Sequence, residues 1–474
     1  MKRTRFPPEP NGFLHLGHVK AMMFDFKYDD CILRFDDTNP STEKQAFVDA
    51  IREDIDWLGY KYTRVTYTSD YFEKLLAYAI ELIKKDLAYV DFTGKEKLKE
   101  MRRSGVGSEY RGKSVEWNLL EFEKMAKGVY PDDHAVLRLK ISMTHVNHSL
   151  RDPIAYRIKF TEHYRTKDRY KVYPTYDYSH GIVDSLEGIT DSYCTMEFYT
   201  RREQYYWPCS KLGLVPATVT EFGRLNVENV ILSKRKIIPL IESKVLSGFD
   251  DPRLYTIRGL RRRGFTPEIL KDLVARTTME RHDSTLSKGF IDHTLRTALD
   301  PMAIRVFAVM NPIRVNIVNH TEDKPCIHGS HITKLTKQIY IERTDFRETD
   351  SADYYRLAPP KKTIRLRFSD FIEYVSHDAD SISVALTIPE KPKKIKGIIH
   401  WVNSESQPAI FEIYDDLTIH RYDGFIEPYG LLNKDKIMQF ERVGYFKFDR
   451  YSETKLPIFI QIISLLDKYN KKIE

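Results

Sequence analysis

The sequence has few cysteines and no long apolar run. Its four cysteines, at positions 31, 194, 209 and 326, form no CxxC pair. This argues against a disulfide framework or a zinc site and favours a reducing compartment. No apolar stretch approaches the ~18–20 residues that cross a bilayer, and the N-terminal MKRTRFPPEP lacks the apolar core of a signal peptide. We therefore expect a cytoplasmic protein with no membrane partner.

A strong charge imbalance is also missing. The chain has 75 Lys and Arg against 68 Asp and Glu, a formal net charge of +7. Local basic clusters lie at 261–263, 361–367 and 391–396. Each alone is more typical of a solvated surface, but several clusters in one basic chain favour a polyanionic partner such as nucleic acid. A chain of 474 residues is too long to fold around one ordinary hydrophobic core, so we predict two to four domains.

Strands and helices alternate in residues 1–90. KRTRF and CILRFDD are typical of strands, Asn39 and Pro40 predict the start of a helix that ends at Gly59, and a second helix follows Ser69. This alternation predicts a parallel sheet. Residues 91–170, rich in Arg and Lys, interrupt it, and the pattern resumes from residue 171. Residues 238–300 read as helical, and short alternating runs after residue 300 predict one or two β-barrels.

The stretch PPEPNGFLHLGH links the first strand to a helix. The N-terminus of a helix presents free N–H groups and partial positive charge, which suits a phosphate. His15 and His18 could donate hydrogen bonds to phosphate oxygens, and Gly17 leaves space for a base or ribose. A chance match is the alternative for the four letters HLGH alone, but the strand–loop–helix context counts against it.

Three other short stretches carry polar groups suited to chemistry. In VILSKRKI, Ser233 and Lys234 form a polar loop from which the lysine could reach a pyrophosphate; an exposed basic loop is the alternative. Asp36 ends a strand, where open α/β sheets bind ligands, and could hold an ammonium group. Asp37 could instead support the start of a helix. Tyr176 could hydrogen-bond a small polar substrate or be a core aromatic.

Together these stretches resemble the class I aminoacyl-tRNA synthetases, most closely the glutaminyl type. HLGH is similar to the HIGH motif and LSKRK to the KMSKS motif. RFPPEPNG, LRFDDTNP, DSLEGIT, CTMEF, GRLN and DDPRLYTIRGLRRRG occur in the family's order over nearly the whole chain. The resemblance implies an α/β Rossmann-type catalytic domain (1–90 and 171–237), an α+β acceptor-stem-binding insertion (91–170), a helical subdomain (238–300) and two all-β anticodon-binding barrels (301–474).

The resemblance also implies an activity and a site. The expected reaction is ATP-dependent formation of glutaminyl-adenylate from L-glutamine, then transfer to the 2′-hydroxyl of the terminal adenosine of tRNA(Gln). We expect a monomer that uses Mg²⁺ with ATP and has no prosthetic group or resident metal. His15, His18 and Lys234 would stabilise phosphate charge, and Glu9 is a candidate proton acceptor. Glutamine would contact Arg5, Asp36 and Tyr176. ATP would contact Glu9, Pro10, Asn11, His15, Leu16, Gly17, His18, Val19, Lys20, Ala21, Thr195, Arg224, Leu225, Leu232, Ser233 and Lys234.

Glutamyl-tRNA synthetases of the archaeal and eukaryotic type share this architecture. Their counterpart of SYCTMEF carries arginine in place of Cys194, and a thiol cannot pair with a γ-carboxylate. PEPNG and YSHGI also favour glutamine. Val219 departs from the glutamine usual in the glutaminyl type, which leaves the recognition of the amide open. A non-catalytic tRNA-binding relative and a small-molecule nucleotidyltransferase are further alternatives. The intact HLGH and LSKRK count against the first, and the β-rich C-terminal part counts against the second.

Overall fold

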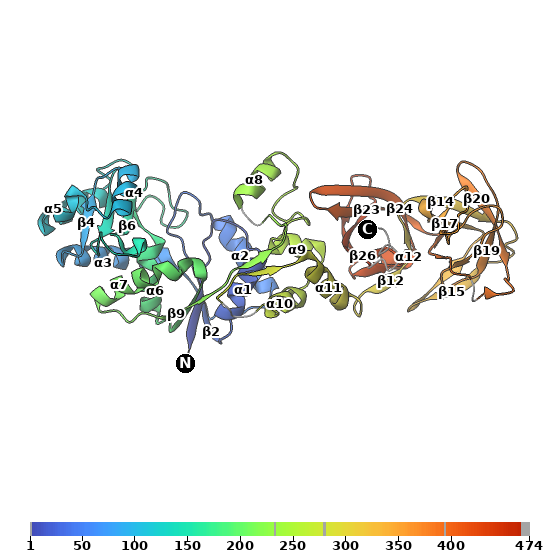
Figure 1. Cartoon of the computed structure of the whole chain (residues 1–474), viewed down its shortest axis with the longest axis horizontal. Coiled ribbons are helices and arrows are strands. Elements are labelled where there is room, and N and C mark those ends of the chain that lie inside the picture. Colours follow the sequence, from blue (N-terminus) through green and yellow to red (C-terminus); the bar gives the residue numbers. More distant parts are fainter. Residues whose placement is uncertain (1, 232–233, 278–280, 393–394, 466–474) are drawn as a thin grey trace. The chain divides into compact units, whose positions relative to one another are not determined.

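The computed structural model describes residues 2–231, 234–277, 281–392 and 395–465. These form two compact units (Figure 1). The first comprises Met1–Lys234 and Leu270–Leu286, and the second Arg235–Ile269 and Ser287–Glu474. Across the described residues, every helix is too short or too polar to cross a membrane. The predicted fold class, α/β in the first part and all-β in the last, is confirmed.

A parallel sheet lies at the centre of the first unit. Strands β1 (Arg3–Phe6), β2 (Asp30–Phe35) and β3 (Arg64–Tyr67) pair in that order, and β8 (Asp191–Thr195) pairs with β9 (Thr218–Phe222). The Thr190 N–H donates to the Arg3 carbonyl at 2.9 Å, which places β8 beside β1. The strand order therefore reverses between β1 and β8. In open α/β sheets, ligands bind outside the carboxyl ends of the strands at such a switch point.

Helices α1 (Leu16–Asp25) and α2 (Gln45–Trp57) connect β1 to β2 and β2 to β3, and α3 (Phe72–Lys84) follows β3. The predicted start of α2 at Asn39 and Pro40 is wrong. Glu43 instead accepts a hydrogen bond from the Asn39 N–H at 2.8 Å, and the Lys44 N–H donates to the Pro10 carbonyl at 3.0 Å. These bonds hold residues 38–44 as turns against the PPEPNG loop. The predicted end of α2 before Gly59 and the start of α3 after Ser69 are confirmed.

A second, antiparallel sheet follows in the same unit. Its strands are β4 (Ala88–Asp91), β5 (Val136–Leu139), β6 (Ile154–Ile158) and β7 (Val172–Pro174). Its apolar core includes Leu82, Phe122, Leu137 and Tyr156, all buried. Figure 1 shows α4 and α5 beside this sheet. The helices that accompany it are α4 (Lys95–Ser104), α5 (Val115–Ala126), α6 (Tyr176–Glu187) and α7 (Arg202–Leu212).

Short elements lead from the first unit into the second. β10 (Leu225–Val227) pairs in parallel with β11 (Ser284–Leu286). The helices of this region are α8 (Lys234–Glu242), α9 (Ile257–Arg263), α10 (Pro267–Ala275) and α11 (Lys288–Leu299). Single 3₁₀ turns occur elsewhere in the chain, at Thr68–Tyr71, Glu109–Gly112, His148–Leu150, Met196–Arg201 and Arg343–Asp345.

The second unit contains two seven-stranded sheets, each with its own apolar core. One runs β21 (Ile398–Ile399), β18 (Thr363–Leu366), β19 (Phe371–His377), β20 (Ser381–Thr387), β14 (Pro312–Ile317), β17 (Gln338–Glu342) and β22 (Val402–Asn403). The other runs β12 (Ile304–Val306), β25 (Met438–Phe440), β26 (Gly444–Tyr451), β27 (Pro457–Ser464), β23 (Gln407–Asp415), β24 (Thr418–Ile426) and β13 (Ala308–Val309). A hairpin, β15 (Lys324–His328) and β16 (His331–Leu335), and helix α12 (Pro428–Leu432) complete the unit.

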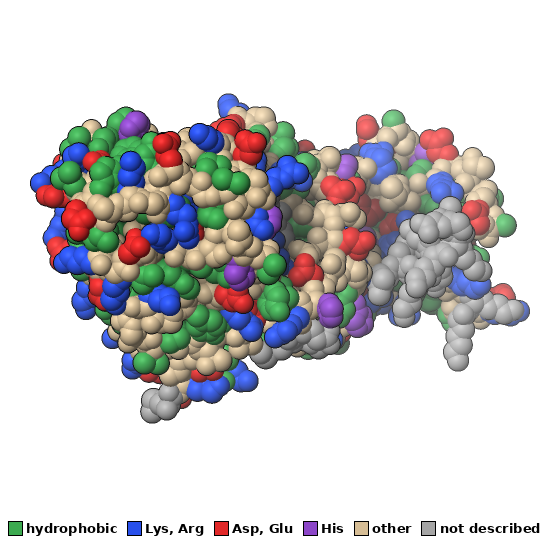
Figure 2. Space-filling view, turned by 60° about the vertical axis from the view of Figure 1, so that its left-hand side comes forward, with side chains coloured by type: hydrophobic (Ala, Val, Ile, Leu, Met, Phe, Trp, Pro, Cys, Tyr) green, Lys and Arg blue, Asp and Glu red, His purple; other side chains and the backbone are tan. Residues whose placement is uncertain are grey.

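The basic clusters of the sequence are partly used inside the protein. Arg262 pairs with Asp449 at 2.9 Å, and the Arg263 side chain donates to the Ile462 carbonyl at 3.2 Å. Arg367 pairs with Glu441 at 2.6 Å. Figure 2 shows Lys and Arg side chains spread over the visible face among Asp and Glu. These arginines therefore join elements of the second unit, and their clustering by itself identifies no nucleic-acid surface.

Candidate functional site

The HLGH segment forms the N-terminus of α1, directly after β1 and its loop. His15 is the N-cap residue, and its Nδ1 accepts a hydrogen bond from the Gly17 N–H at 3.1 Å. His18 Nδ1 accepts from the His15 N–H, also at 3.1 Å. The two side chains therefore form a reciprocal capping box in which imidazoles replace the usual hydroxyl and carboxylate. Their ring centroids lie 4.0 Å apart.

These bonds fix which nitrogen of each ring carries the proton. An imidazole nitrogen that accepts a hydrogen bond is unprotonated, so Nε2 of each neutral ring bears the N–H. Burial and the nearby Arg224 guanidinium lower the pKa of His15 to about 4. Burial and His15 hold the pKa of His18 well below its ordinary value. At neutral pH the site therefore offers two uncharged N–H donors at a helix N-terminus.

The His15 ring leaves no room for a side chain at position 17, so this arrangement requires glycine there. A Cβ at this position would lie 2.9 Å from His15 Cε1 and 3.5 Å from the Leu225 carbonyl. The predicted role for Gly17 was to let a base or ribose approach the backbone. In the structure, the space of its missing side chain is filled by the His15 ring, and Gly17 lies against the start of β10.

Five of the other predicted ATP contacts fall into two groups. Leu16, Val19 and Lys20 are buried, with 0–1% of each exposed, so these side chains face the protein interior. Thr195 and Arg224 come together through Glu197, which accepts from Thr195 Oγ1 at 2.9 Å and pairs with Arg224 at 3.4 Å. Sequence reasoning quoted Glu197 within CTMEF but assigned it no role. In the sequence, the one indication that Glu197 belongs to this group is that it lies only two residues after Thr195.

Lys234, the first residue of α8, packs against the loop that precedes HLGH. Its Nζ donates to the Asn11 carbonyl and lies 4.8 Å from the centroid of the Phe47 ring. A Cβ on Gly12 would lie 3.6 Å from Lys234 Cδ. Burial and Lys44 lower the pKa of Lys234. The lysine of the second motif therefore reaches the PPEPNG loop of the first, whereas Leu232 and Ser233 lie outside the described residues.

Asp36 follows β2, at the carboxyl edge of the parallel sheet. Only 1% of the residue is exposed, and neither carboxylate oxygen has a hydrogen-bond partner among the described residues. Burial and the Glu9 carboxylate raise the pKa of Asp36 to about 7, against the opposing effects of Arg34 and of the Thr68 and Thr38 hydroxyls. A buried carboxylate with such weak support from donors is costly unless a ligand supplies one. An ammonium group is such a ligand.

Other acidic residues surround Asp36. Asp37 accepts from the Ser69 N–H at 2.7 Å and the Ser69 hydroxyl at 2.6 Å, so it supports the start of the next helical segment, the structural alternative considered for it. Partial desolvation raises the pKa of Glu9. Burial raises the pKa of Glu43 to about 9, and sequence reasoning missed this residue because it expected a helix there. The surroundings of Asp36 therefore disfavour additional negative charge.

A pocket near the carboxyl end of β8 contains Cys194 and Val219, the two positions at which the sequence was compared with the glutamyl and glutaminyl types. It is lined by Tyr176, Asp177, His180, Ser192, Cys194, Phe198, Arg201, Arg202, Tyr205 and Val219. Burial raises the pKa of the Cys194 thiol to about 12 and that of Tyr176 well above its ordinary value, so both groups are neutral. Tyr176 stacks on His180, with centroids 4.5 Å apart.

The arginines of this region already have carboxylate partners. Arg201 pairs with Asp177 at 3.1 Å, and Arg202 pairs with Glu221. Arg5, which is fully buried, lies behind the pocket wall and pairs with Asp184 at 3.1 Å.

Arg5 also reaches two residues that line the pocket. It donates to Ser192 Oγ at 2.7 Å and contacts His180 Nε2. Arg5 therefore touches the pocket only indirectly among the described residues: it holds two of the side chains that line it. His180 and Ser192 were not predicted as site residues, and their placement depends on this long-range contact with β1.

The chain is similar to known proteins over its whole length. A family model for the catalytic domain of the class I tRNA synthetases (E and Q) matches residues 1–299, and the model for their anti-codon binding domain matches residues 303–389. The glutamine–tRNA ligase of Lupinus luteus is 39% identical over 99% of this chain, which spans 65% of that relative. The glutamine–tRNA ligase of Serratia proteamaculans is also 39% identical, and the chain spans 94% of its length.

Among solved structures, a glutamate–tRNA synthetase from Elizabethkingia anophelis aligns with 64% of this chain and 71% of its own. The TM-score is 0.46 and the sequence identity 19%. The two family models and the near-complete bacterial relative are much stronger matches. The chain therefore belongs to the class I tRNA synthetases for glutamate and glutamine, and within them to the glutaminyl-tRNA synthetases.

Proposed function

We propose that the glutaminyl-tRNA synthetase activity of this chain resides at the carboxyl edge of the parallel sheet, with a separate role for each residue group. Asp36 binds the ammonium of L-glutamine, and the pocket of Tyr176 and Cys194 takes its side-chain amide. The HLGH segment and Lys234 bind the phosphates of ATP. The observation that carries this proposal is the buried Asp36 carboxylate, neither oxygen of which has a close hydrogen-bond donor among the described residues.

In the first step, a carboxylate oxygen of glutamine attacks the α-phosphorus of ATP. The bond from this phosphorus to the oxygen bridging to the β-phosphate breaks, and pyrophosphate leaves. The glutamine carboxylate is already ionised near neutral pH, so no base is required. The Nε2–H groups of His15 and His18 and the ammonium of Lys234 stabilise the negative charge that moves onto the phosphate oxygens.

In the second step, the 2′-hydroxyl of the terminal adenosine of tRNA(Gln) attacks the carbonyl carbon of the adenylate, and AMP leaves. The hydroxyl proton needs an acceptor. Glu9 is the candidate, because it lies on the loop before HLGH and its raised pKa makes it a stronger base than an ordinary carboxylate.

Magnesium would accompany ATP. The described groups assigned to the phosphates are N–H donors and an ammonium, which do not ligate Mg²⁺. We propose that the ion is held mainly by the phosphate oxygens and water, as Mg²⁺ prefers. It would neutralise phosphate charge there. We further propose a location in the cytoplasm, for which the four free cysteines are the supporting observation, and a monomer, which rests on the family resemblance alone.

The choice of glutamine over glutamate rests on charge. The arginines in and behind the pocket are paired with carboxylates, and the Cys194 thiol is neutral, so a γ-carboxylate would enter without a free cation from these groups. A buried, unpaired charge is disfavoured by several kcal/mol.

The test is a charging reaction of tRNA(Gln) with glutamine and glutamate in competition. We expect strong preference for glutamine in the wild type. The variant Cys194→Arg should lose about 10–100-fold in kcat/KM for glutamine and gain relative use of glutamate. Cys194→Ser, which stays neutral at similar size, should keep the wild-type preference. Preferential transfer of glutamate by the wild type would overturn the substrate assignment.

A separate assay would distinguish the proposed enzyme from the alternative that this chain binds tRNA without catalysis. ATP–pyrophosphate exchange should occur with glutamine and tRNA present. If tRNA binds but exchange never appears, the proposed catalytic role of HLGH and Lys234 is wrong.

A further inference from the structure

A second pair of histidines three residues apart lies in the second unit, in the sequence His328-Gly-Ser-His331. The two residues are the last pair of the β15–β16 hairpin, directly opposite each other across a two-residue turn. Directly paired residues of an antiparallel hairpin project from the same face. Their ring centroids lie 4.9 Å apart. The hairpin therefore brings two imidazoles to one point by its register alone.

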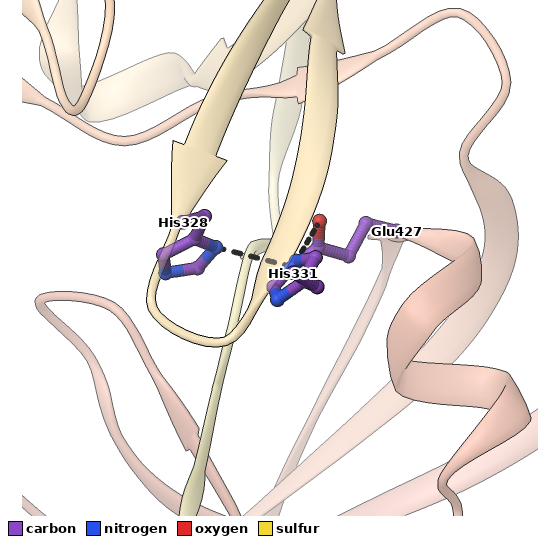
Figure 3. Close-up of side chains that lie close together, drawn as sticks. All are labelled: His328, His331 and Glu427. Atoms are coloured by element: carbon purple, nitrogen blue, oxygen red, sulfur yellow. Dashed lines mark hydrogen bonds and ion pairs between the residues drawn. The ribbon is translucent and has the colours of Figure 1, made fainter.

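Glu427 meets these histidines from a different part of the unit. It follows β24 and immediately precedes α12. Glu427 Oε1 lies 3.4 Å from His328 Nδ1, and Glu427 Oε2 lies 3.0 Å from His331 Nε2. Figure 3 shows the carboxylate pointing toward both rings. One potential ligand atom from each residue lies within 4.8 Å of the other two.

The surroundings are those of a buried ligand site. His328 is 0% exposed, and the partner of its Nδ1 among the described residues is Glu427 Oε1, 3.4 Å away. Its other nitrogen, Nε2, lies 3.4 Å from Glu441 Oε1. Metal-binding histidines commonly donate their second N–H to a carboxylate, which fixes the tautomer and aims the free nitrogen at the ion. Arg367 in turn holds Glu441 at 2.6 Å.

We propose that His328, His331 and Glu427 bind a divalent transition metal, with Zn²⁺ the best match, and that Glu441 orients His328. Two imidazoles and one carboxylate form a common three-ligand set for zinc, with water at the fourth position. Bonds of about 2.0–2.1 Å place tetrahedral ligand atoms roughly 3.3 Å apart. The two histidine nitrogens lie 3.4 Å and 3.0 Å from different oxygens of Glu427, and the three ligand atoms lie within 4.8 Å of one another, so metal binding would draw them closer together.

Bound metal would join two parts of the second unit. The β15–β16 hairpin forms a sheet of its own, whereas Glu427 leads from β24 into α12. The ion would tie the tip of the hairpin to the sheet that contains β24. This inference does not depend on the proposed reaction, because none of its residues is assigned to ATP or glutamine.

The test uses the full chain without an affinity tag. The chain is dialysed against EDTA, then titrated separately with Zn²⁺ and Co²⁺. Bound metal is counted by mass spectrometry, and the Co²⁺ visible spectrum reports ligand type and geometry. His331→Gln and Glu427→Gln remove ligands. His377→Gln is the matched control, since His377 is an exposed imidazole on β19 of the same unit.

We expect about one metal per chain in the wild type and in His377→Gln. The two ligand variants should bind at least tenfold more weakly, and Zn²⁺ should raise the Tm of the wild type but not of these variants. A tetrahedral Co²⁺ spectrum without a thiolate charge-transfer band would support the ligand set.

Wild-type protein that binds neither metal overturns the proposal, whatever the folding of the variants. So does undiminished binding in both ligand variants. In either case, the three residues form only a histidine–carboxylate network.

Discussion

The two His-x-x-His segments of this chain have the same spacing and opposite electrostatics. In His15–His18 each Nδ1 accepts from a backbone N–H, and burial lowers both pKa values. In His328–His331 the rings face carboxylates. Burial again opposes a charge on His328, but Glu427 and Glu441 outweigh it and raise its pKa. The first pair directs its Nε2–H groups away from its own capping bonds, where they can meet an anion, whereas the second lies between carboxylates and would have to release its protons to offer lone pairs to the proposed cation. The difference comes from the local backbone: the first pair lies at the N-terminus of a helix, and the second lies at the end of a β-hairpin.

The buried carboxylates of the two sites differ in the same way. Neither oxygen of Asp36 has a close donor among the described residues, and burial raises its pKa to about 7 despite the nearby Thr68 and Thr38 hydroxyls. Burial also opposes ionisation of Glu427, but His328, His331 and the Phe307 N–H outweigh it and hold its pKa below the ordinary value. The catalytic site therefore has an unsatisfied acceptor for its substrate. The second site already has donors, which a metal would replace.

The largest expected effect comes from removing an imidazole of the first pair. His18→Ala should reduce ATP–pyrophosphate exchange by about 10²–10³-fold, because it removes one donor to phosphate and half of the capping box. Exchange is measured with tRNA and saturating glutamine.

His331→Gln is the control for the same spacing in the other unit, and it should leave exchange within about twofold of wild type. Comparable losses in both variants would mean that the two pairs do not have separate functions.

Neutralising the two carboxylates should change stability in opposite directions. Asp36→Asn should lower kcat/KM for glutamine by about 10²-fold yet stabilise the chain by roughly 1–2 kcal/mol at pH 7.5. Its folded pKa exceeds the unfolded value, so ionisation there costs stability as pH rises. Glu427→Gln should destabilise by about 1–3 kcal/mol at this pH, because its lowered pKa contributes stability above pH ~4.3. Urea unfolding checks both, and a stabilised Glu427→Gln would contradict the comparison.

The pH dependence of substrate binding separates the two kinds of group within the catalytic site. Below pH 7 Asp36 becomes protonated in the free enzyme and loses its attraction for ammonium. The KM for glutamine should therefore rise by up to about tenfold per pH unit as pH falls below 7. His15, with a pKa of about 4, keeps its neutral form throughout, so the KM for ATP should stay nearly constant from pH 8 to 6. A flat KM for glutamine would show that Asp36 does not hold the ammonium.

Local sequence patterns predicted the features that depend on neighbouring residues. Strand, loop and helix around HLGH follow from the order of apolar and capping residues, and the Asp36 position follows from the end of β2. The predicted start of α2 was wrong because residues 38–44 are held outside the helix by two hydrogen bonds. Glu43 accepts one of them, and the Pro10 carbonyl, which is distant in sequence, accepts the other. The amide pocket combines residues from α6, β8, α7 and β9, and no local pattern could show that Arg5 would lie behind it.

The histidine pair of the second unit likewise could not be recognised as a site from local sequence. Sequence reasoning argued against a zinc site from cysteine spacing and considered no site made of histidine and carboxylate. HGSH alone is a short turn. Its third ligand, Glu427, lies 96 residues beyond His331, and the sheet that carries it meets the hairpin only in the folded unit.

The smallest expected effects come from the glycine inside each pair, and they differ in kind. Gly17→Ala would place a Cβ 2.9 Å from His15 Cε1, so it should displace the ring and reduce exchange about tenfold with little loss of stability. Gly329 has a φ of +58°, and a Cβ there would make only an ordinary van der Waals contact, 3.6 Å from Arg305 Cβ, so Gly329→Ala should cost about 1 kcal/mol of stability and leave exchange unchanged. Gly329→Asn should cost less, because Asn tolerates this conformation. Thermal unfolding and exchange on all three variants would show whether the first glycine serves the ligand site and the second the turn; loss of exchange in Gly329→Ala would contradict that division.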